Sequence, residues 1–310
     1  MVKIGILFPG QGAQFVGMGK EWAAEFSTAV RVYEQADKIL GVPISRYCFE
    51  GPEDTLTRTL YAQPAIFVTS LALYSVLQEK TRGLKADLVA GLSLGEFTAL
   101  VAAGALTFSE GLKLVQKRAE FMEKSAERNP GTMVSILGLN QEECEAISRE
   151  SGSEIANLNA LDQFVLSGKE AAVAKAAELA EGMGAKKVIH LKVGGAFHSS
   201  LMRQAKAGLE ESLKQTLIQR PRNVFIPNVT AREEDDPERI RSLLGEQLIS
   251  PVRWIQTMER ARGLGIRRFI EIGPGRVLKG LAKRISSSLE VFSFERLTDL
   301  GTTETILERV

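Results

Sequence analysis

The amino-acid sequence predicts an α/β fold in which a small second domain is inserted into a large one. Apolar runs of strand length alternate with segments of helical length near both ends of the chain, a pattern typical of α/β proteins. The segment 130–194 instead follows the order βαββαβ, which is the ferredoxin-like pattern. At 310 residues, the chain is long enough for a main domain with a smaller one inside it.

The N-terminal part of the chain predicts two strand–helix units. The segment 2–8 has the length and composition of a buried strand, and the loop that follows it is rich in turn residues. The second predicted helix carries Pro64 in its first turn, where a missing N–H removes no helical hydrogen bond. The elements predicted here are strands at 2–8 and 86–90 and helices at 19–40, 63–78 and from Gly95 to about Ala103.

The middle of the chain predicts the small inserted domain. Its predicted elements are strands at 132–137, 154–158, 164–166 and 186–193 and helices at 141–149 and 169–181. Hinges rich in glycine bracket it at 129–131 and 194–195. The α/β pattern then resumes with a strand at 268–272 and a helix at 277–285. We therefore expect a catalytic domain made of 1–129 and 195–310 and an insert of 130–194.

Composition and charge exclude several classes of protein. Hydrophobic residues make up 44% of the chain and charged residues 25%, which is ordinary for a globular protein. The formal net charge of +1 gives no reason to expect a nucleic-acid partner. The two cysteines, Cys48 and Cys144, lie far apart in sequence and suggest neither a metal cluster nor a disulfide framework. We expect no cofactor and no metal.

The sequence predicts a cytoplasmic protein. The apolar run from Ile4 to Phe8 is too short for a signal peptide, and no small-residue cleavage site follows it. We also expect no membrane span, since no run of roughly 18 apolar residues is evident. The sequence does not indicate an oligomeric state, and a monomer is compatible with it.

A nucleophile motif lies between a predicted strand and a predicted helix. Residues 91–95, Gly-Leu-Ser-Leu-Gly, fit the pattern G-x-S-x-G, in which a sharp turn lifts the serine hydroxyl out of the sheet. A five-residue match also arises by chance, so the flanking strand and helix carry the interpretation. They favour Ser93 as the nucleophile, with the backbone N–H of Leu94 at the helix N-terminus facing a developing oxyanion.

A serine nucleophile needs a base, and the chain holds only two histidines. Strand alternation places His190 on the same face as Lys192, which indicates a solvated face. His198 follows a strand in a glycine-rich loop, where catalytic residues tend to lie. A structural histidine is the alternative for either residue, and we predict His198 as the base.

The acid of a triad is not evident. Between Ser93 and His198 the only aspartate is Asp162, which lies in a predicted hairpin turn of the small domain. We therefore predict a Ser–His dyad whose imidazole is oriented by a group other than a carboxylate, such as a backbone carbonyl.

One arginine lies on the wrong face of its predicted helix. The helix from Phe108 to about Glu127 has a clear apolar arc, and Arg118 falls near its middle. A buried guanidinium needs an anionic partner. That partner is either a nearby carboxylate in a structural ion pair or the carboxylate of a substrate held by two parallel hydrogen bonds.

Taken together, these motifs resemble those of the malonyl-CoA:acyl-carrier-protein transacylases, which are related to the acyltransferase domains of polyketide synthases. The resemblance spans the whole chain, and several separate motifs in one order are more specific than any one of them. The motifs that carry it are 8–12 (FPGQG), 63–65 (QPA), 93–96 (SLGE), Arg118 before 121–122 (FM), 197–198 (FH), 228–229 (NV), 251–252 (PV) before Trp254, and 271–275 (EIGPG).

The resemblance implies roles for individual residues. Ser93 corresponds to the acylated nucleophile and His198 to the base, while the backbone N–H groups of Gln11 and Leu94 correspond to the oxyanion hole. Arg118 corresponds to the residue that binds the malonyl carboxylate. The main-chain carbonyl of Gln247 corresponds to the group that orients the histidine, and Phe197 to a bulky residue that crowds an α-methyl branch.

The resemblance also implies the fold and the reaction. The large domain is expected to be α/β-hydrolase-like, with the active site in the cleft beside the ferredoxin-like insert. Malonyl groups would pass from malonyl-CoA to the phosphopantetheine thiol of acyl carrier protein through a malonyl-serine ester, supplying fatty acid synthesis. One position departs from the family, because Leu92 stands where a histidine usually precedes the nucleophile.

Other functions remain as alternatives. A stand-alone polyketide-type acyltransferase would share these residues. An acyl hydrolase on the same scaffold is disfavoured by Arg118, because uncharged acyl groups need no carboxylate clamp. A silent carrier-binding protein is disfavoured because the predicted site residues all occur together. A basic group near the C-terminal helix is either a carrier-docking patch or an ordinary solvated face: Arg267, Arg268, Lys279, Lys283 and Arg284.

Overall fold

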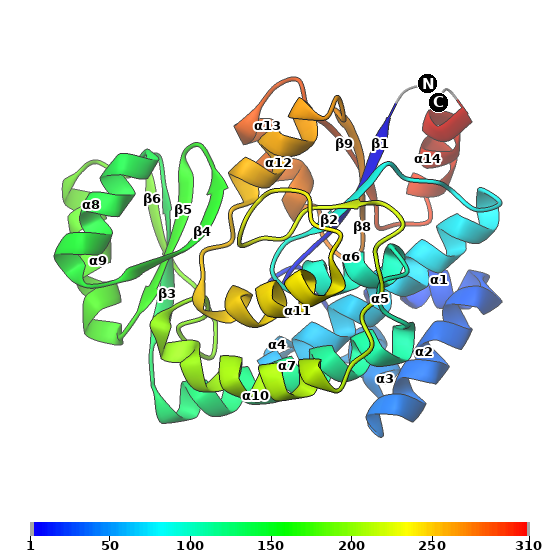
Figure 1. Cartoon of the computed structure of the whole chain (residues 1–310), viewed down its shortest axis with the longest axis horizontal. Coiled ribbons are helices and arrows are strands. Elements are labelled where there is room, and N and C mark those ends of the chain that lie inside the picture. Colours follow the sequence, from blue (N-terminus) through cyan, green and yellow to red (C-terminus); the bar gives the residue numbers. More distant parts are fainter. Residues whose placement is uncertain (1–2, 309–310) are drawn as a thin grey trace.

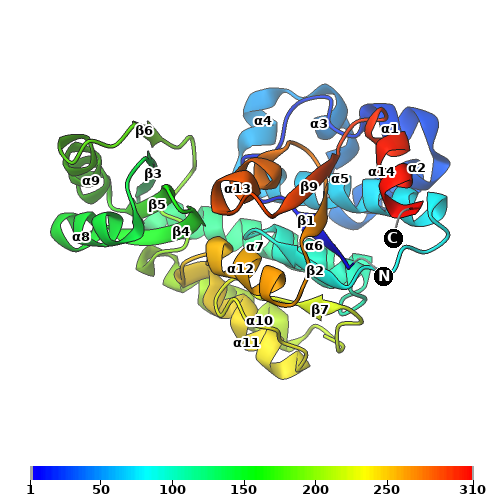
Figure 2. The ribbon, with the colours of Figure 1, turned by 90° about the horizontal axis from the view of Figure 1, so that it is seen from above.

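The computed structural model describes residues 3–308 as two units, each built around its own β-sheet. The larger unit contains both ends of the described chain, which lie close together (Figure 1). The smaller unit, formed by the middle of the sequence, stands to one side of it (Figures 1 and 2). The predicted arrangement of a large α/β unit and a small βαββαβ unit is therefore present.

The large sheet is parallel throughout, in the order β7-β2-β1-β8-β9. Its central strand β1 is buried along its whole length because helices cover both faces. This explains why its sequence reads as a continuous apolar run rather than an alternating one. The strands are β1 (Ile4–Phe8), β2 (Leu88–Gly91), β7 (Val224–Phe225), β8 (Arg268–Ile272) and β9 (Glu290–Phe294).

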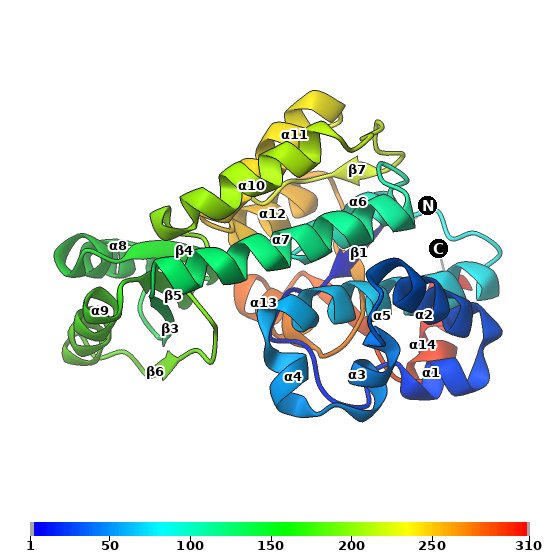
Figure 3. The same ribbon diagram turned by 90° about the horizontal axis from the view of Figure 1, so that it is seen from below.

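Different helices cover the two faces of this sheet. One face packs against α5 (Thr59–Lys80), α6 (Gly95–Ala102) and α7 (Phe108–Arg128), and the other against α12 (Trp254–Gly263) and α13 (Val277–Ile285). Helix α7 is long and extends from the large unit to the small sheet, with α10 beside it (Figure 3). The remaining helices of the large unit are α1 (Lys20–Glu25), α2 (Ser27–Leu40), α3 (Ile44–Glu50), α4 (Glu53–Thr57), α10 (Arg203–Lys214), α11 (Pro237–Glu246) and α14 (Asp299–Glu308).

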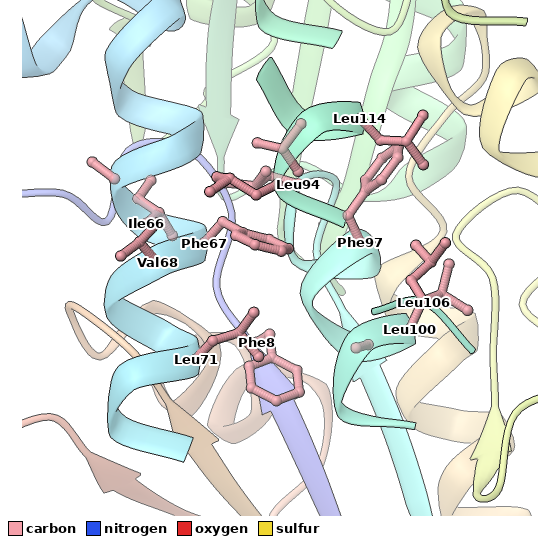
Figure 4. Packing of buried hydrophobic residues seen from close by; sticks show 14 of the residues in the cluster. Phe8, Ile66, Phe67, Val68, Leu71, Leu94, Phe97, Leu100, Leu106 and Leu114 are labelled. Atoms are coloured by element: carbon pink, nitrogen blue, oxygen red, sulfur yellow. The ribbon is translucent and has the colours of Figure 1, made fainter. Parts of the chain in front are cut away.

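The core next to the nucleophile turn is packed with large apolar side chains. Phe67 and Leu71 of α5 and Phe8 of β1 gather in the space between α5 and α6, with Leu94 above them (Figure 4). All four are at most 3% exposed. Burying each such side chain stabilises the fold by about 1.5–3 kcal/mol, so the turn that carries Ser93 rests on a rigid support.

The small sheet is antiparallel, in the order β4-β5-β3-β6. Its strands and helices follow the predicted order βαββαβ, with both helices packed on one face. The elements are β3 (Thr132–Leu137), α8 (Gln141–Ser151), β4 (Glu154–Ala160), β5 (Gln163–Gly168), α9 (Glu170–Gly182) and β6 (Lys187–His190). The domain boundaries 1–129, 130–194 and 195–310 stay a prediction, and residues 1, 2, 309 and 310 lie outside the described part.

Three predicted elements need correction. The segment 19–40 forms two helices, because Phe26 adopts an extended conformation between them. Helix α5 begins at Thr59, so Pro64 lies inside the helix rather than in its first turn. Strand β6 ends at His190 and not at Val193. The predicted first strand also included Val2, which lies outside the described residues.

Helix α5 bears on the expectation that the chain has no membrane span. It contains a window with mean hydropathy 1.5, so by length and composition it could cross a membrane. However, 78% of that window is buried inside the protein, as in the central helix of a packed core. Its hydrophobicity is therefore explained by contact with the large sheet and with α2 and α7.

Candidate active site

Ser93 lies on a sharp turn between strand β2 and helix α6. Its φ of 52° is in the left-handed region, which few residues other than glycine adopt. A Cβ on Gly91 would overlap the backbone of Gly95, and a Cβ on Gly95 would overlap the carbonyl oxygen of Phe8. Both glycines of the motif are thus required by close backbone approach, which supports the predicted nucleophile turn.

Ser93 and His198 are in direct contact. The Oγ of Ser93 lies 2.7 Å from Nε2 of His198, and Nδ1 of His198 donates a hydrogen bond of 2.8 Å to the backbone oxygen of Gln247. Because a carbonyl oxygen can only accept, Nδ1 carries the proton and Nε2 is free to accept one from the serine. The structure therefore brings together the predicted dyad and the predicted orienting carbonyl.

His198 is held in its neutral form. Burial, followed by the positive charge of Arg118, lowers the pKa of its imidazole from 6.5 to about 4. The ring is only 5% exposed, and the φ of 57° at His198 is also in the left-handed region. A neutral imidazole next to a serine hydroxyl can act as a general base at neutral pH.

Arg118 is buried and points at the nucleophile. Its Nη2 donates to Ser93 Oγ and to Gln247 Oε1, both at 2.9 Å, and its Nη1 donates to Gln63 Oε1 at 2.6 Å. The side chain is 1% exposed. These neutral acceptors hold the guanidinium in place but do not neutralise its charge.

Among the side chains that the structure describes, no carboxylate lies within ion-pair distance of Arg118. The alternative of a structural ion pair is therefore not what the structure contains. Burial lowers the pKa of Arg118 to about 10, its Nε has no hydrogen-bond partner, and the guanidinium lies 5.6 Å from the ring centre of Phe97. A buried cation with a free donor, adjacent to a serine hydroxyl, is suited to receive an anionic substrate group.

The two predicted oxyanion donors lie on loops that flank Ser93. Among the hydrogen bonds of residues 3–308, none uses the backbone N–H of Gln11 or of Leu94. The side chain of Gln11 is fixed separately, because its Nε2 donates to Thr59 Oγ1 at 3.2 Å and its Oε1 accepts from Gln63 Nε2 at 3.3 Å. Neither N–H group is therefore committed to a partner within the described part of the chain.

Phe197, the residue before His198, forms part of the wall of a cavity. This cavity of about 500 Å³ is also lined by Thr59 and Ala126 and by charged side chains such as Arg58 and Lys192. Phe197 itself is only 5% exposed and packs in the large core. Leu92, in the position where the family usually has histidine, is half-buried against the apolar core on the sheet face covered by α12 and α13.

Three polar residues of the site were not assigned a role from the sequence: Gln63, Glu96 and Asn228. Each is fully buried and hydrogen-bonded to a predicted site residue. Gln63 bonds to Arg118, Glu96 to Gln247, and Asn228 to the backbone N–H of Ser93. Gln63 and Glu96 each lie in a stretch of helix that is otherwise mostly apolar. The signal that revealed Arg118, a polar group on a buried helical face, would have revealed these two residues as well.

The other candidates lie elsewhere. His190 is exposed on β6, as predicted. Asp162 lies in the β4–β5 turn and accepts from Arg284 of α13, so it is not a triad acid. Within the described chain, no group of three or more His, Cys, Asp or Glu side chains could hold a metal ion. Cys48 and Cys144 are both buried and unbridged, and burial raises the pKa of each thiol to about 12.

Residues 6–298 match the model of the acyl transferase domain family. The chain belongs to this family. The malonyl CoA-acyl carrier protein transacylase of Bacillus subtilis (strain 168) is 42% identical to this acyl transferase chain over 298 residues, which cover 94% of this chain and 93% of that protein.

Solved structures resemble this acyl transferase over its full length. The acyl-carrier-protein-S-malonyltransferase from Bartonella henselae has a TM-score of 0.95 and 36% identity, covering 99% of this chain and 100% of that one. A type II PKS acyl-carrier protein in complex with its malonyl-transacylase has a TM-score of 0.95 and 34% identity, with coverage of 99% and 100%. The predicted fold, family resemblance and acyltransferase class are confirmed by these matches.

Proposed function

We propose that this chain transfers the malonyl group of malonyl-CoA to the phosphopantetheine thiol of acyl carrier protein through an ester on Ser93. The observation that carries the proposal is the buried guanidinium of Arg118, which forms no ion pair with a described side chain and whose Nη2 lies 2.9 Å from the Ser93 hydroxyl. A malonyl thioester places a carboxylate two bonds from the carbonyl that the serine attacks. Arg118 is thus positioned to hold the carboxylate while Ser93 reacts with the carbonyl.

In the first half-reaction, Ser93 Oγ attacks the thioester carbonyl and His198 Nε2 accepts the serine proton. The backbone N–H groups of Gln11 and Leu94 bind the oxyanion of the tetrahedral intermediate. When the carbon–sulfur bond breaks, His198 returns the proton to the sulfur of coenzyme A. A malonyl ester on Ser93 and free coenzyme A result.

In the second half-reaction, the pantetheine thiol of the carrier gives its proton to His198 and its sulfur attacks the ester. The same donors hold the oxyanion, and His198 then returns the proton to Ser93. No cofactor enters either half-reaction, because both are exchanges between an ester and a thioester. The malonyl carrier so formed supplies carrier-linked chain elongation, of which fatty acid synthesis is the form we expect.

The reaction products test this proposal against hydrolysis. The protein is incubated with malonyl-CoA, with and without holo acyl carrier protein, and acyl-enzyme, acyl-carrier and free malonate are followed by mass spectrometry. We expect a stable acyl-enzyme without carrier and malonyl-carrier when it is present. Free malonate as the main product in both samples would instead make the protein an acyl hydrolase.

A further inference from the structure

Glu96 is a buried carboxylate that the proposed reaction does not use. It lies in the first turn of α6, three residues after Ser93, and is completely inaccessible to solvent. Its Oε2 accepts from Gln247 Nε2 at 2.7 Å and from the backbone N–H of Asn228 at 3.0 Å, while its Oε1 has no partner. A buried carboxylate is costly unless it is well hydrogen-bonded, so its place beside the dyad calls for an explanation.

The side-chain amide of Gln247 has one favourable orientation. Its Nε2 donates to Glu96 Oε2 and, at 3.0 Å, to the backbone oxygen of Ser93, which uses both of its hydrogens. Its Oε1 accepts from Arg118. Turning the amide over would bring Nε2 against the donors of Arg118 and Oε1 against two acceptor oxygens. Glu96 supplies one of the two acceptors that prevent this reversal.

Gln247 therefore connects three predicted site residues through one amino acid. Its backbone oxygen holds His198, its side-chain oxygen holds Arg118, and its side-chain nitrogen holds the backbone of Ser93. The hydrogen bond from the Asn228 backbone N–H to Glu96 supports the turn that carries Ser93. The Asn228 side chain holds this turn at two points, because its Oδ1 accepts from the Ser93 N–H and its Nδ2 donates to the Gly91 carbonyl, both at 2.7 Å.

We propose that Glu96 is a positioning residue, which fixes Gln247 so that Arg118 and His198 both keep their alignment on Ser93. This inference rests on the proposed function only for the part that concerns Arg118. If Glu96 has this role, activity depends mainly on an oxygen at the position of Oε2 that accepts these hydrogen bonds, and less on the negative charge of the carboxylate. Burial raises the pKa of Glu96 to about 7, and a proton on Oε1 leaves both bonds to Oε2 intact.

Two substitutions separate the effect of the position of the acceptor oxygen from the effect of the carboxylate charge. Glu96→Gln keeps an acceptor oxygen at the same distance but removes the charge, whereas Glu96→Asp keeps the charge but withdraws the oxygens by one methylene. We expect kcat/KM for malonyl-CoA to fall roughly threefold or less in Glu96→Gln. In Glu96→Asp it should fall roughly 10- to 100-fold, the loss expected for one or two buried hydrogen bonds.

A scaffold role and a positioning role of Glu96 predict different losses of activity with malonyl-CoA and acetyl-CoA. Releasing the Gln247 amide frees Arg118, so Glu96→Asp should lose more activity with malonyl-CoA than with acetyl-CoA. It should also cost several-fold less in a Gln247→Ala background, because Glu96 acts mainly through that side chain. An equal fall for both thioesters, a multiplicative loss with Gln247→Ala, or a Gln variant as impaired as the Asp variant would each overturn the proposal.

The reaction of Ser93 with a neutral sulfonyl fluoride keeps the test independent of malonyl transfer. That reaction depends on the Ser93–His198 dyad and needs no carboxylate clamp. Its rate should be close to that of the parent in Glu96→Gln and lower in Glu96→Asp, even if malonyl-CoA proves not to be the substrate. Equal rates in all three proteins would show that Glu96 does not act on the dyad.

Discussion

At the scale of single residues, the site is organised around one buried charge that has no ion-pair partner among the described side chains. Arg118 is surrounded by the neutral oxygens of Gln63, Gln247 and Ser93. Burial lowers its pKa to about 10, and the nearby carboxyl of Glu96 offsets only part of that shift. Removing a guanidinium from water is costly, and these acceptors recover only part of that cost. A substrate carboxylate would supply the missing anion, so the Arg118 guanidinium would gain its ion-pair partner when the malonyl group binds.

Substituting Arg118 should separate malonyl from acetyl transfer. Two charge-assisted hydrogen bonds of about 1.5–3 kcal/mol each imply that Arg118→Ala loses roughly 10²- to 10⁴-fold in kcat/KM for malonyl-CoA. Acetyl-CoA makes neither bond, so its loss should be far smaller and reflect only the contact between Arg118 and Ser93. Arg118→Lys should recover malonyl transfer only in part, since an ammonium lacks the planar fork. A parallel fall for both thioesters, with a lowered melting temperature, would make Arg118 a scaffold residue.

The protonation of His198 predicts the acid limb of the pH profile. The base must be neutral to accept a proton, and its folded pKa of about 4 lies below the usual 6.5. Reactivity of Ser93 towards a neutral sulfonyl fluoride should therefore persist as the pH falls below 6.5 and decline only towards about 4. Circular dichroism at each pH verifies folding, and Glu96→Gln removes the nearby group that titrates near 7. Half-maximal reactivity near pH 6.5 would contradict the described environment of the imidazole.

Part of the site could be predicted from residue types alone, and part could not. Ser93 was identified by a motif, His198 because it was one of two histidines, and Arg118 because a charge fell on an apolar arc. Gln63 and Glu96 remained without a role, because their partners come from α7 and from the segment near Gln247, far away in sequence. The apolar pattern around them indicates that both side chains are buried, but their pairings depend on the packing of distant elements, which no local pattern contains.

At the scale of elements, the local sequence pattern predicted the bounds of strands and helices where tertiary packing agreed with secondary-structure propensity. Strand β3 and helix α13 have the predicted bounds, since alternation or an amphipathic face continues to their ends. The predicted helix 19–40 is interrupted at Phe26, which carries no helix-breaking signal. There the rings of Trp22 and Phe26 pack together, and Trp22 Nε1 donates to the Glu295 backbone oxygen, so tertiary contacts override helix propensity.

Substitutions of a glycine in the nucleophile turn and of a glycine on an exposed helix should have opposite effects on stability. Gly95→Ala would force a methyl group into the backbone of Phe8, so it should lower the free energy of unfolding by about 1–3 kcal/mol or more and abolish activity. Gly280 lies exposed in helix α13 with open space at its Cβ position, so Gly280→Ala should raise that energy by about 0.5–1 kcal/mol. Thermal unfolding measures both. A Gly95→Ala protein with parental stability and activity would refute the close packing of the turn.

At the scale of the whole molecule, side chains tie the two units together. Arg284 of α13 contacts the β4–β5 turn, with 2.8 Å between its Nη2 and Asp162 Oδ1, and its Nη1 donates to Gln163 at 2.5 Å. Arg268 pairs with Glu290. Two of the five basic residues predicted to form a docking patch are thus already paired. Arg267, Lys279 and Lys283 form no ion pair with any side chain that the structure describes, and the two lysines line a cavity of about 450 Å³.

If these free cations bind an acidic carrier protein, its KM should rise with salt while the KM for malonyl-CoA stays nearly flat, because exposed charges are screened within about 8–10 Å at physiological salt. Lys279→Gln with Lys283→Gln should raise the carrier KM at low salt and reduce its salt dependence. Lys113→Gln, which removes an exposed charge from α7, is the control. Steady-state kinetics with each substrate varied gives both constants. An equal salt response for the two substrates would leave this group a solvated face.

The covalent intermediate tests the whole account most directly. The protein is loaded with labelled malonyl-CoA, freed of unbound thioester, and divided into one sample for peptide mapping and one that receives holo acyl carrier protein. We predict that the label lies on the peptide that contains Ser93, is absent from Ser93→Ala, and moves to the pantetheine thiol when carrier is added. A label on another residue, or its release as malonate without transfer to the carrier, would contradict the proposed mechanism.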